Sequence, residues 1–511
     1  MTSTIGICIS IVIYLVAMLL IGAACSKRNK TTDDFYLGGR KLGPFVTAMS
    51  AEASDMSSWL LMGLPGVAYL TGVADAGWTA IGLAVGTYLN WLLVAKRIRV
   101  YSTELGAITV PDFFARRFDD KQHILTAISA VVILIFFIPY TASGFAACGK
   151  LFSSLFGVNY VAAMVISGAV IVAYTTMGGF LAASTTDLVQ SIVMTAALFI
   201  MMVFGVHMAG GMDAVMTNAR SLPGYLSMTM SYDVASNSAG AYRPITIIST
   251  MAWGLGYFGM PHILLRFMAI EDKEKLKLSR RVATIWVVIS MFVAIFIGVV
   301  GLAVSAAGAV DTLQGSAAET IIVRLSGLLA SFGFVPALLA GVVLAGILAS
   351  TMSTADSQLL AAASSVSQNL MDECFHVKVS ERVKVWTARG TVLGISLIGM
   401  ILARNPDSSV FAIVSFAWAG FGAAFGPAML FSLFWKRTTK WGILAGMLSG
   451  GVMIFVWKYL VRPLGGAWNI YELLPAFVVS CLFILIVSLA TKAPSQEIQD
   501  KFDTIKPLTK A

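Results

Sequence analysis

Apolar stretches of about 20 residues recur along this chain, and short polar segments separate them. A helix of that length can cross the ~30 Å hydrocarbon core of a bilayer. The pattern predicts thirteen spans, near residues 4–25, 44–71, 77–95, 124–149, 159–178, 185–209, 244–265, 283–306, 330–366, 387–403, 408–434, 441–461 and 469–490. The ninth region is too long for one straight crossing and is expected to include an extra helical piece. We therefore predict an all-α polytopic membrane protein with about thirteen transmembrane helices.

Composition and charge agree with this class. The chain is 58% hydrophobic and 12% charged, whereas soluble domains carry about 25% charged residues. Of the 35 Lys and Arg residues, 28 lie in or beside the segments that follow spans 1, 3, 7, 9, 11 and 13. This asymmetry predicts that these segments are cytoplasmic, with the N-terminus outside and the C-terminus inside. Because loops that set orientation explain the net charge of +9, no nucleic-acid partner is expected.

The second span, Phe45–Gly66, is apolar enough to cross a membrane but has a polar middle. Its polar residues are Glu52, Ser54, Asp55, Ser57 and Ser58, and they are followed by the helix breakers Gly63, Pro65 and Gly66. An ionisable side chain at mid-membrane costs ~2.5–3.5 kcal/mol on insertion scales, so it persists where it meets water, a partner or an ion. A broken helix also frees backbone carbonyls as ligands. The alternative is a polar seam between packed helices.

A second polar stretch lies in Leu344–Leu360, where Ser350, Ser353 and Thr354 share one helical face by their spacing. Hydroxyls and freed carbonyls are hard oxygen ligands that suit a small cation such as Na⁺, and Asp356 and Gln358 add polarity beside them. Ser and Thr also serve as small residues at helix interfaces, so both interpretations remain open.

Two further stretches combine polar or aromatic residues with helix breakers. Met251–Arg266 has an aromatic and glycine-rich pattern typical of a discontinuous helix beside a small substrate, or else of an interfacial aromatic belt. Asp187 starts the sixth span and is expected either to cap that helix or to pair with a cytoplasmic arginine as a gate. Tyr140, next to Pro139 in the fourth span, is a candidate for the cavity wall.

Broken, polar spans occur at the second and seventh positions, five spans apart. Five spans inverted against five is an arrangement of transporters with a midplane site. This predicts a first helix with a cytoplasmic loop (1–43), two inverted repeats (44–210 and 211–435), two further spans (436–492) and a cytoplasmic tail (493–511). The external segments 210–243 and 307–329 either cover an outer vestibule or serve as connectors, and the 266–281 segment is expected to be a solvated helical face.

Several motifs identify a family resemblance that runs over nearly the whole chain. They are L-G-G-R-K-L-G-P-F at 37–45, A-S-D-M-S at 53–57, M-G-L-P-G at 62–66, W-G-L-G-Y-F-G-x-P-H at 253–262, M-S-T at 352–354 and W-A-G-F-G-A-A-F-G-P at 418–427. In these motifs and their order the chain resembles the sodium/solute symporter family, and within it the bacterial members that carry proline. The resemblance implies the inverted-repeat fold first seen in the bacterial leucine transporter, and import of L-proline with Na⁺ by alternating access.

The resemblance also implies roles for individual residues. Na⁺ is expected at the backbone carbonyls of Ala53, Met56 and Ser350 and the hydroxyls of Ser353 and Thr354, with Asp55 important for Na⁺ dependence. The residues that match the substrate side are Ser57, Tyr140, Trp253, Tyr257 and Pro261. The residues that match charged cytoplasmic-side positions for the ion path or gating are Arg40 and Asp187. Na⁺ is the only metal ion expected.

This sequence departs from the family pattern at five positions in or near these motifs. Glu52 and Ser58 stand where the proline symporters have glycine, Ser350 replaces alanine, Met260 replaces glutamine and Asp356 replaces a small residue. An additional acid at Glu52 is expected either to alter the ion path or substrate choice, or to lie harmlessly one turn from the site.

These observations predict a Na⁺-coupled symporter for a small amino acid, most plainly L-proline, in the bacterial plasma membrane, and not an enzyme. Another small amino acid or a monocarboxylate remains open as the substrate. An ion channel would share the spans and the buried acid, but the paired broken helices argue against it. A sensor or an enzyme would need an output domain or a catalytic constellation, and the sequence displays neither.

Overall fold

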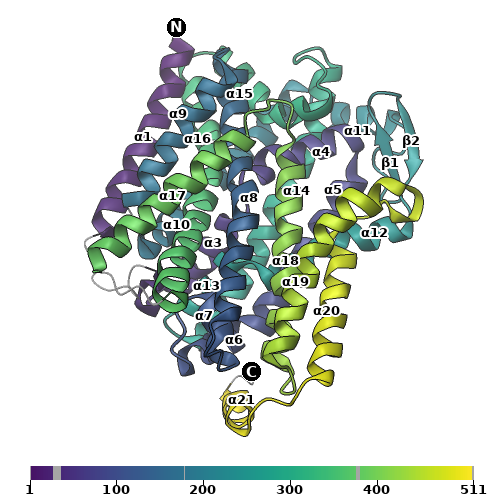
Figure 1. Cartoon of the computed structure of the whole chain (residues 1–511). Helices are drawn as coiled ribbons and strands as arrows, with labels where there is room; N and C mark the ends of the chain where they lie inside the picture. The colour runs from purple at the N-terminus through teal and green to yellow at the C-terminus, as the bar shows by residue number, and fades with distance from the viewer. Residues whose placement is uncertain (1, 27–35, 178, 376–379, 509–511) are drawn as a thin grey trace.

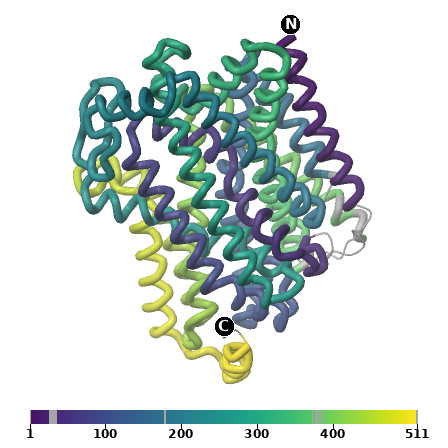
Figure 2. Tube along the Cα trace, turned by 180° about the vertical axis from the view of Figure 1, so that it is seen from behind, coloured from purple at the N-terminus to yellow at the C-terminus, as the bar shows by residue number. Residues whose placement is uncertain are grey.

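The structure is a computed structural model that describes residues 2–26, 36–177, 179–375 and 380–508. Residues 27–35 of the predicted first loop and residues 509–511 of the predicted tail lie outside this described part. Most helices run side by side between two ends of the molecule, with the N-terminus at one end and the C-terminus at the other (Figure 1). Seen from behind, α1 and the last long helices occupy opposite sides, and the remaining helices pack between them (Figure 2).

The α-helices of the first half of the chain are α1 (Thr2–Ser26), α3 (Pro44–Asp55), α4 (Leu64–Thr71), α5 (Val73–Leu89), α6 (Ala95–Glu104), α7 (Val110–Arg117), α8 (Ile124–Phe156), α9 (Tyr160–Met177), α10 (Phe180–Met208) and α11 (Met212–Ser221). Those of the second half are α12 (Pro244–Met251), α13 (Pro261–Ala269), α14 (Leu276–Ala306), α15 (Ile321–Ser331), α16 (Phe334–Ser364), α17 (Glu381–Leu402), α18 (Val410–Phe434), α19 (Lys440–Val456), α20 (Leu473–Ala490) and α21 (Gln496–Leu508).

Short 3-10 and π-helical turns join or extend these helices. The 3-10 turns are η1 (Gly38–Arg40), η4 (Ala252–Gly259), η5 (Lys273–Lys275), η6 (Gly315–Thr320), η9 (Arg462–Leu464) and η10 (Gly466–Trp468), and the π turns are η2 (Trp59–Gly63), η3 (Asn90–Val94), η7 (Ser365–Cys374) and η8 (Trp457–Val461). Two antiparallel strands, β1 (Met230–Asp233) and β2 (Ser238–Ala241), form a hairpin that pairs Met230 with Ala241.

Nine helices in the described residues are long and apolar enough to cross a membrane, and three apolar helical segments are shorter: Trp59–Thr71, Tyr160–Thr176 and Trp386–Leu402. Together with the interrupted α12–η4–α13 segment they correspond to the thirteen apolar regions of the sequence. The number of crossings stays a prediction, because the assignment rests on length and composition. The ninth region, 330–366, begins in the last two residues of α15, continues as the 31-residue helix α16 and runs into the π turn η7. Helical pieces other than α16 therefore lie at both of its ends.

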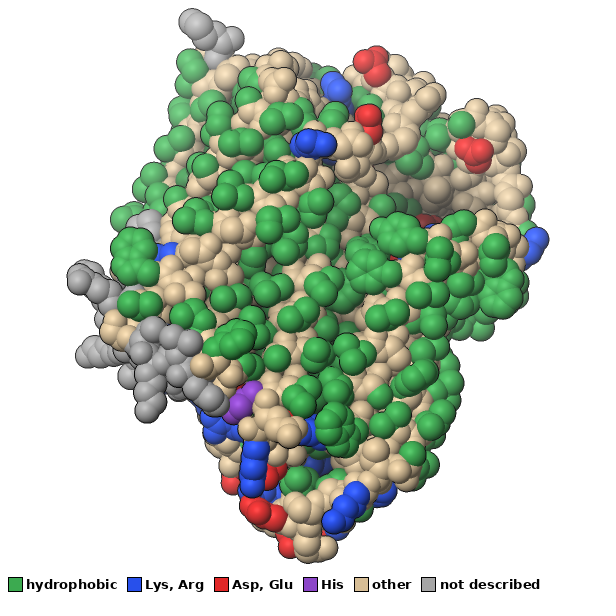
Figure 3. All heavy atoms as spheres, viewed as in Figure 1, with side chains coloured by type: hydrophobic (Ala, Val, Ile, Leu, Met, Phe, Trp, Pro, Cys, Tyr) green, Lys and Arg blue, Asp and Glu red, His purple; other side chains and the backbone are tan. Residues whose placement is uncertain are grey.

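Large apolar side chains cover the flank of the molecule, whereas Lys and Arg gather toward the end where α21 lies (Figure 3). Ile13, Ile192 and Phe292 are each more than 60% exposed. A soluble protein rarely leaves so much contiguous apolar surface in water, so this belt is the surface that faces lipid. The interior is also packed with apolar side chains, and the polar groups described below are buried inside it.

The second apolar region is a helix in two parts. α3 ends at Asp55, and Met56 adopts φ −76° and ψ 66° while the Ser57 amide donates to the Asp55 carbonyl at 2.8 Å. This is an inverse γ-turn. The chain then resumes as η2 and α4, with Pro65 in the first turn of α4, where a missing amide hydrogen is tolerated. The predicted break is present, and it lies directly after the acid.

The seventh region is broken in the same manner. α12 gives way to the eight-residue 3-10 segment η4, and Pro261 opens α13 after an extended Met260. The glycines of η4 are needed for close packing: a Cβ on Gly254 would lie 2.1 Å from the Gly82 carbonyl oxygen of α5. A Cβ on Gly256 would lie 1.9 Å from Nε1 of Trp418 in α18. Small residues thus let two helices approach the broken segment closely.

The two long segments that are predicted to be external contain regular structure. Segment 210–243 holds α11 and the β-hairpin, and Tyr225 donates to the Ala68 carbonyl at 2.8 Å, which ties the segment to the end of α4. Segment 307–329 holds η6 and most of α15. The expectation for 266–281 was wrong at its first residues, because Arg266 is 1% exposed and belongs to α13.

Candidate ion and substrate site

The break in α3 lies against the middle of α16. The Ser353 hydroxyl donates to the Ala53 carbonyl oxygen at 2.8 Å and lies 3.2 Å from the Ser350 carbonyl oxygen. The Thr354 hydroxyl lies 3.1 Å from the same Ser350 oxygen. Two carbonyls and two hydroxyls from helices 300 residues apart in the sequence are therefore within hydrogen-bond reach of one another. This is a small cluster of hard oxygen atoms with no formal charge.

The turn at Met56 explains why the Ala53 carbonyl is free to face α16. In a continuing helix the Ser57 amide would donate to Ala53, but here it donates to Asp55. The last carbonyls of a helix lack internal partners and carry partial negative charge, which favours a cation. Of the predicted ion ligands, the structure brings together Ala53, Ser350, Ser353 and Thr354. Met56 is fully buried at the break beside them.

Asp55 lies at the meeting point of three elements. Its carboxylate oxygen Oδ2 accepts from the Tyr257 hydroxyl of η4 at 2.7 Å. Its backbone carbonyl accepts from the Tyr140 hydroxyl of α8 at 3.2 Å and from Nε1 of Trp59 at 3.1 Å. The second carboxylate oxygen, Oδ1, has no hydrogen-bond partner within the described part of the chain. The predicted substrate-side residues Tyr140 and Tyr257 thus converge on the acid of the broken helix.

Aromatic rings of η2, η4 and neighbouring elements pack together beside this junction. Trp253 has ring-centroid distances of 5.2 Å to both Tyr471 and Phe411 and of 6.0 Å to Trp59. Its carbonyl accepts from Nε1 of Trp418 at 2.8 Å. Flat apolar faces with a few polar groups suit a compact, partly apolar solute.

The other two predicted substrate-side residues occupy the two breaks. The Ser57 hydroxyl accepts from the Trp59 amide at 3.4 Å, within the turn that follows Asp55. Pro261 is buried at the first position of α13. The structure thus places Ser57 close to Asp55, and it places Pro261 at the far end of η4.

A buried ion pair lies toward the C-terminal end of the bundle. Arg266 Nη2 lies 3.2 Å from Asp187 Oδ2, and that oxygen also accepts from the Ser50 hydroxyl at 2.6 Å. Arg266 donates as well to Ser50 at 3.0 Å and to Ser357 at 2.5 Å. One guanidinium therefore links α13, α3, α10 and α16. Asp187 lies in the third turn of α10, which begins at Phe180, so the alternative that it caps this helix was wrong.

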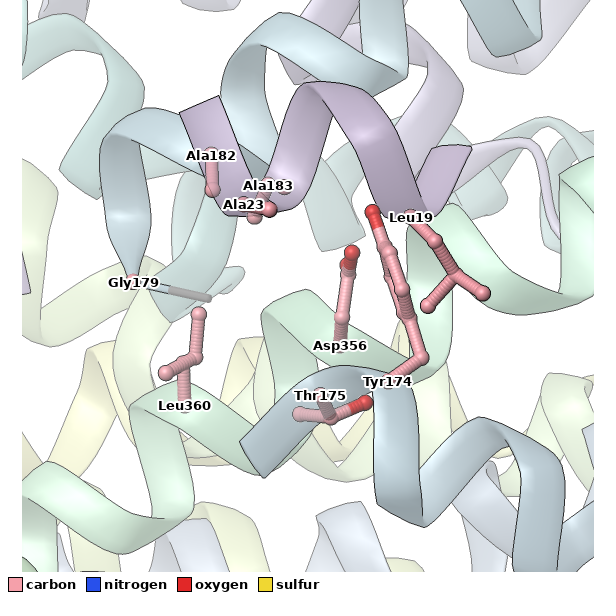
Figure 4. Close-up of a pocket in the computed structure, with 10 residues that line it drawn as sticks. Leu19, Ala23, Tyr174, Thr175, Gly179, Ala182, Ala183, Asp356 and Leu360 are labelled. Atoms are coloured by element: carbon pink, nitrogen blue, oxygen red, sulfur yellow. The ribbon is translucent and has the colours of Figure 1, made fainter. Parts of the chain in front are cut away.

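A second acid lies beside this pair and borders a small pocket. Asp356 accepts from the Ser357 hydroxyl at 3.2 Å, and its carboxylate points, with the Tyr174 side chain, into the pocket shown in Figure 4. Leu19 of α1 and Gly179 at the start of α10 also line it. The extra acid of this sequence thus increases the negative charge near the single Arg266 guanidinium.

Arg40, the other predicted gating residue, belongs to a different set of contacts. It donates to the Met268 carbonyl at 2.7 Å and to the Ala107 carbonyl at 2.6 Å. It also donates to the Ser102 hydroxyl at 3.1 Å. Arg40 thus ties η1 to the end of α13 and to the segment between α6 and α7, whereas Asp187 is held by Arg266.

Sequence reasoning missed the roles of three charged side chains. Arg266 stood at the end of an apolar run and was assigned to a solvated segment, although a lone arginine so close to a broken span was a usable signal. Lys150 and Glu319 form a buried ion pair at 2.8 Å, with exposed side-chain fractions of 5% and 6%. Lys150 ends an apolar span and Glu319 lies 169 residues later, so their pairing leaves no local pattern in the sequence.

Comparison with known proteins agrees with this geometry. The model of the sodium:solute symporter family matches residues 35–450. The chain belongs to this family. It is thus a multi-pass membrane protein of a family of Na⁺-coupled symporters and not an enzyme. The motifs that carried the resemblance in the sequence lie almost entirely in the broken helices and in the helices that pack on them.

Two relatives of known name align with almost the whole of this chain. The osmoregulated proline transporter OpuE of Bacillus subtilis (strain 168) is 41% identical over 508 residues, which are 99% of each chain. The sodium/proline symporter of Salmonella typhimurium (strain LT2) is 43% identical over 497 residues, 96% of this chain and 94% of that protein.

A solved structure supports the fold. A Na⁺-coupled sialic acid symporter in a substrate-bound, outward-open state aligns with a TM-score of 0.75 at 17% identity, over 96% of this chain and 99% of that one. The closed conformation of Mhp1, a nucleobase-cation symporter, aligns with a TM-score of 0.53 at 15% identity, over 93% of this chain and 99% of that one. Because these structures are only 17% and 15% identical to this chain, their similarity shows the fold alone. That fold is the predicted inverted-repeat fold with broken helices.

Proposed function

We propose that this chain imports L-proline together with Na⁺ by alternating access. The observation that carries the proposal is the 2.8 Å contact between the Ser353 hydroxyl of α16 and the Ala53 carbonyl at the break in α3. An ion at this point is held by both helices at once, so its affinity depends on how they sit relative to each other. The names of the relatives that share 41–43% of this sequence support proline as the solute.

Na⁺ binds, in this proposal, to the carbonyls of Ala53, Met56 and Ser350 and to the hydroxyls of Ser353 and Thr354. These neutral hard oxygens replace the hydration shell of a small cation without the desolvation cost of an added charge. In this proposal the ion replaces the hydrogen bonds that Ser353 and Thr354 make to the carbonyls of Ala53 and Ser350. Asp55 lies next to this cluster and supplies the negative charge that a buried cation requires.

Proline binds on the other side of the break. Its carboxylate faces the freed backbone near Ser57, and its ring packs against the aromatic residues Tyr140, Trp253 and Tyr257, with Pro261 shaping the end of the cavity. Because Asp55 touches both tyrosines and continues directly into the ion cluster, each ligand stabilises the arrangement that the other one prefers. This shared preference is the coupling free energy of symport.

Gating belongs, in this proposal, to the contacts nearer the C-terminal end. Asp187 and Arg266 join α10 to α13, and Arg40 joins η1 to α13 and the α6–α7 segment. Release to the cytoplasm needs these elements to separate. We place the N-terminus outside and the C-terminus inside a bacterial plasma membrane, and we assign the two inverted repeats to residues 44–210 and 211–435.

Reconstituted protein tests the proposal directly. Proteoliposomes with an inward Na⁺ gradient should accumulate labelled L-proline above equilibrium, and the Ser353→Ala variant should need at least tenfold more Na⁺ for half-maximal uptake. Ser350→Ala is the matched control, because the Ser350 hydroxyl donates back to the Ile347 carbonyl and only its own carbonyl faces the ion. Proline uptake that does not depend on Na⁺ would contradict the proposed Na⁺ coupling. If competing solutes show that another amino acid or a monocarboxylate is preferred to proline, only the assignment of the substrate changes, and Na⁺ coupling stands.

A further inference from the structure

A second group of buried oxygens lies around Glu52 and Asp55 of α3. Glu52 precedes Asp55 by one helical turn, so the two carboxylates share a face of α3. Oε1 of Glu52 accepts from Nε1 of Trp91 at 2.9 Å. Its Oε2 atom, like Oδ1 of Asp55, has no hydrogen-bond partner among the residues that the structure describes. The exposed fractions of the two residues are 1% and 0%.

The helix that faces these acids adds two more oxygens. Thr87 and Asn90 lie one turn apart at the junction of α5 and the π turn η3, and both are fully buried. Asn90 donates through Nδ2 to the Tyr257 carbonyl of η4 at 3.0 Å, and its Oδ1 atom has no hydrogen-bond partner in the described ranges. The Thr87 hydroxyl interacts with the Tyr257 hydroxyl, which also bonds to Asp55. π turns inside α-helices occur often at functional sites. This one turns Asn90 and Trp91 toward α3 and η4.

Two ionised carboxylates at this position require a cation to balance them. Buried charges cost several kcal/mol each unless they are paired, and within the described chain no Lys, Arg or His forms an ion pair with Glu52 or Asp55. The proposed Na⁺ site beside Ser353 has only neutral ligands. One Na⁺ there leaves a net charge of about −1 on the two carboxylates, and a second Na⁺ would neutralise them.

We propose that Glu52, Asp55, Thr87 and Asn90 form a second Na⁺ site, so that two Na⁺ ions enter with each solute molecule. The donor set consists of two carboxylate oxygens, a hydroxyl and an amide oxygen, which are the hard ligands that such an ion prefers. Three elements meet there, because Tyr257 of η4 bonds to both Asp55 and Asn90. The second ion therefore links α3 to α5 and η3, and the hydrogen bonds of Tyr257 join η4 to the same site, as the first ion links α3 to α16. This inference rests on the proposed function, since it assigns a stoichiometry to that transport.

The number of Na⁺ ions transported and bound per proline tests the second site. Fluxes of ²²Na⁺ and labelled proline are measured together in proteoliposomes, and equilibrium ²²Na⁺ binding is measured on the purified full chain. The native protein should carry two Na⁺ per proline and bind two Na⁺. Glu52→Gln and Thr87→Val should each lower both ratios to about one. Thr79→Val is the matched control, because it makes the same change on α5 two turns away at an equally buried hydroxyl, and it should retain both ratios of two.

Each outcome has a definite consequence. A native ratio of one, or a ratio of two that persists in Glu52→Gln and in Thr87→Val, overturns the second site and leaves Na⁺-driven proline uptake intact. Absence of any Na⁺-driven proline uptake by the native protein overturns the proposed function instead. If Glu52→Gln does not fold, Thr87→Val removes one ligand without altering charge, and Na⁺ binding to the purified variant decides the question without transport.

Discussion

Arg266 of α13 lies 3.2 Å from Asp187 of α10, and the two side chains are 1% and 0% exposed. The same guanidinium donates to Ser50 of α3 and to Ser357 of α16. A charge pair this deeply buried is sensitive to the loss of one partner, because the other charge then remains buried and uncompensated. This ion pair and its hydrogen bonds therefore connect α13, α3, α10 and α16, which change their relative positions during alternating access.

Arg266→Met should destabilise the protein by ~3–5 kcal/mol, the usual cost of leaving a buried charge unpaired. Removal of both partners in Arg266→Met/Asp187→Leu should restore part of this loss, since only Asp356 then stays unpaired. Thermal unfolding of the detergent-purified variants measures the effect. Lys275→Met is the control, because Lys275 and Glu271 form an exposed pair at 2.6 Å, and exposed pairs contribute little to stability. A double variant less stable than Arg266→Met would contradict this account.

Glu319 should hold η6 on the start of α18. Its carboxylate accepts from Lys150 at 2.8 Å, from the Ser409 hydroxyl at 2.7 Å and from the Val410 and Phe411 amides at 3.0 and 3.1 Å. An acid at a helix N-terminus also interacts favourably with the helix dipole. Glu319→Gln should therefore speed amide hydrogen exchange in η6 and in the first turn of α18 by about tenfold.

The exposed substitution Glu271→Gln is the control for this measurement, and it should leave exchange in both segments unchanged. Equal protection of η6 and α18 in Glu319→Gln and in the native protein would show that the carboxylate does not hold them together.

Gly256→Ala should abolish proline uptake and lower stability. Its Cβ would lie 1.9 Å from Nε1 of Trp418, so the added methyl group would displace the indole that donates to the Trp253 carbonyl. Uptake and the thermal unfolding midpoint are the measurements. Gly394→Ala in α17 is the matched control, since its Cβ meets nothing within 4 Å. There alanine should be neutral or stabilise the helix by up to ~1 kcal/mol, and uptake at the native level in Gly256→Ala would refute the packing argument.

Tyr140→Phe and Tyr257→Phe should each weaken the apparent affinity for proline about fivefold while the protein stays folded. Each hydroxyl donates to Asp55, at 3.2 and 2.7 Å, and loss of one such hydrogen bond costs ~1 kcal/mol. Concentration-dependent uptake measures the change. Tyr160→Phe is the control, because its hydroxyl bonds the Ala403 carbonyl away from the broken helices. If all three variants shift affinity equally, the two tyrosines have no special role at Asp55.

The sequence by itself determined the class of the protein and the positions of its breaks. Apolar runs specify membrane helices because backbone groups in lipid must bond within the segment, and an acid followed by Gly and Pro marks where such a helix stops. The break at Asp55–Met56 and the 3-10 segment before Pro261 are readable in this way. Family motifs then pointed to Ala53, Ser350, Ser353 and Thr354, and the structure places these residues together.

Only the tertiary structure decided which polar groups meet. Lys150 with Glu319, Arg266 with Asp187, and Glu52 with Trp91 join helices that are far apart in the sequence, and the local pattern does not say which partner each group meets. The physical reason is that a buried charge or carbonyl is defined by its partner across a helix interface. Apolar periodicity fixes which face of a helix turns inward, but the packing of the bundle selects the group that it encounters there.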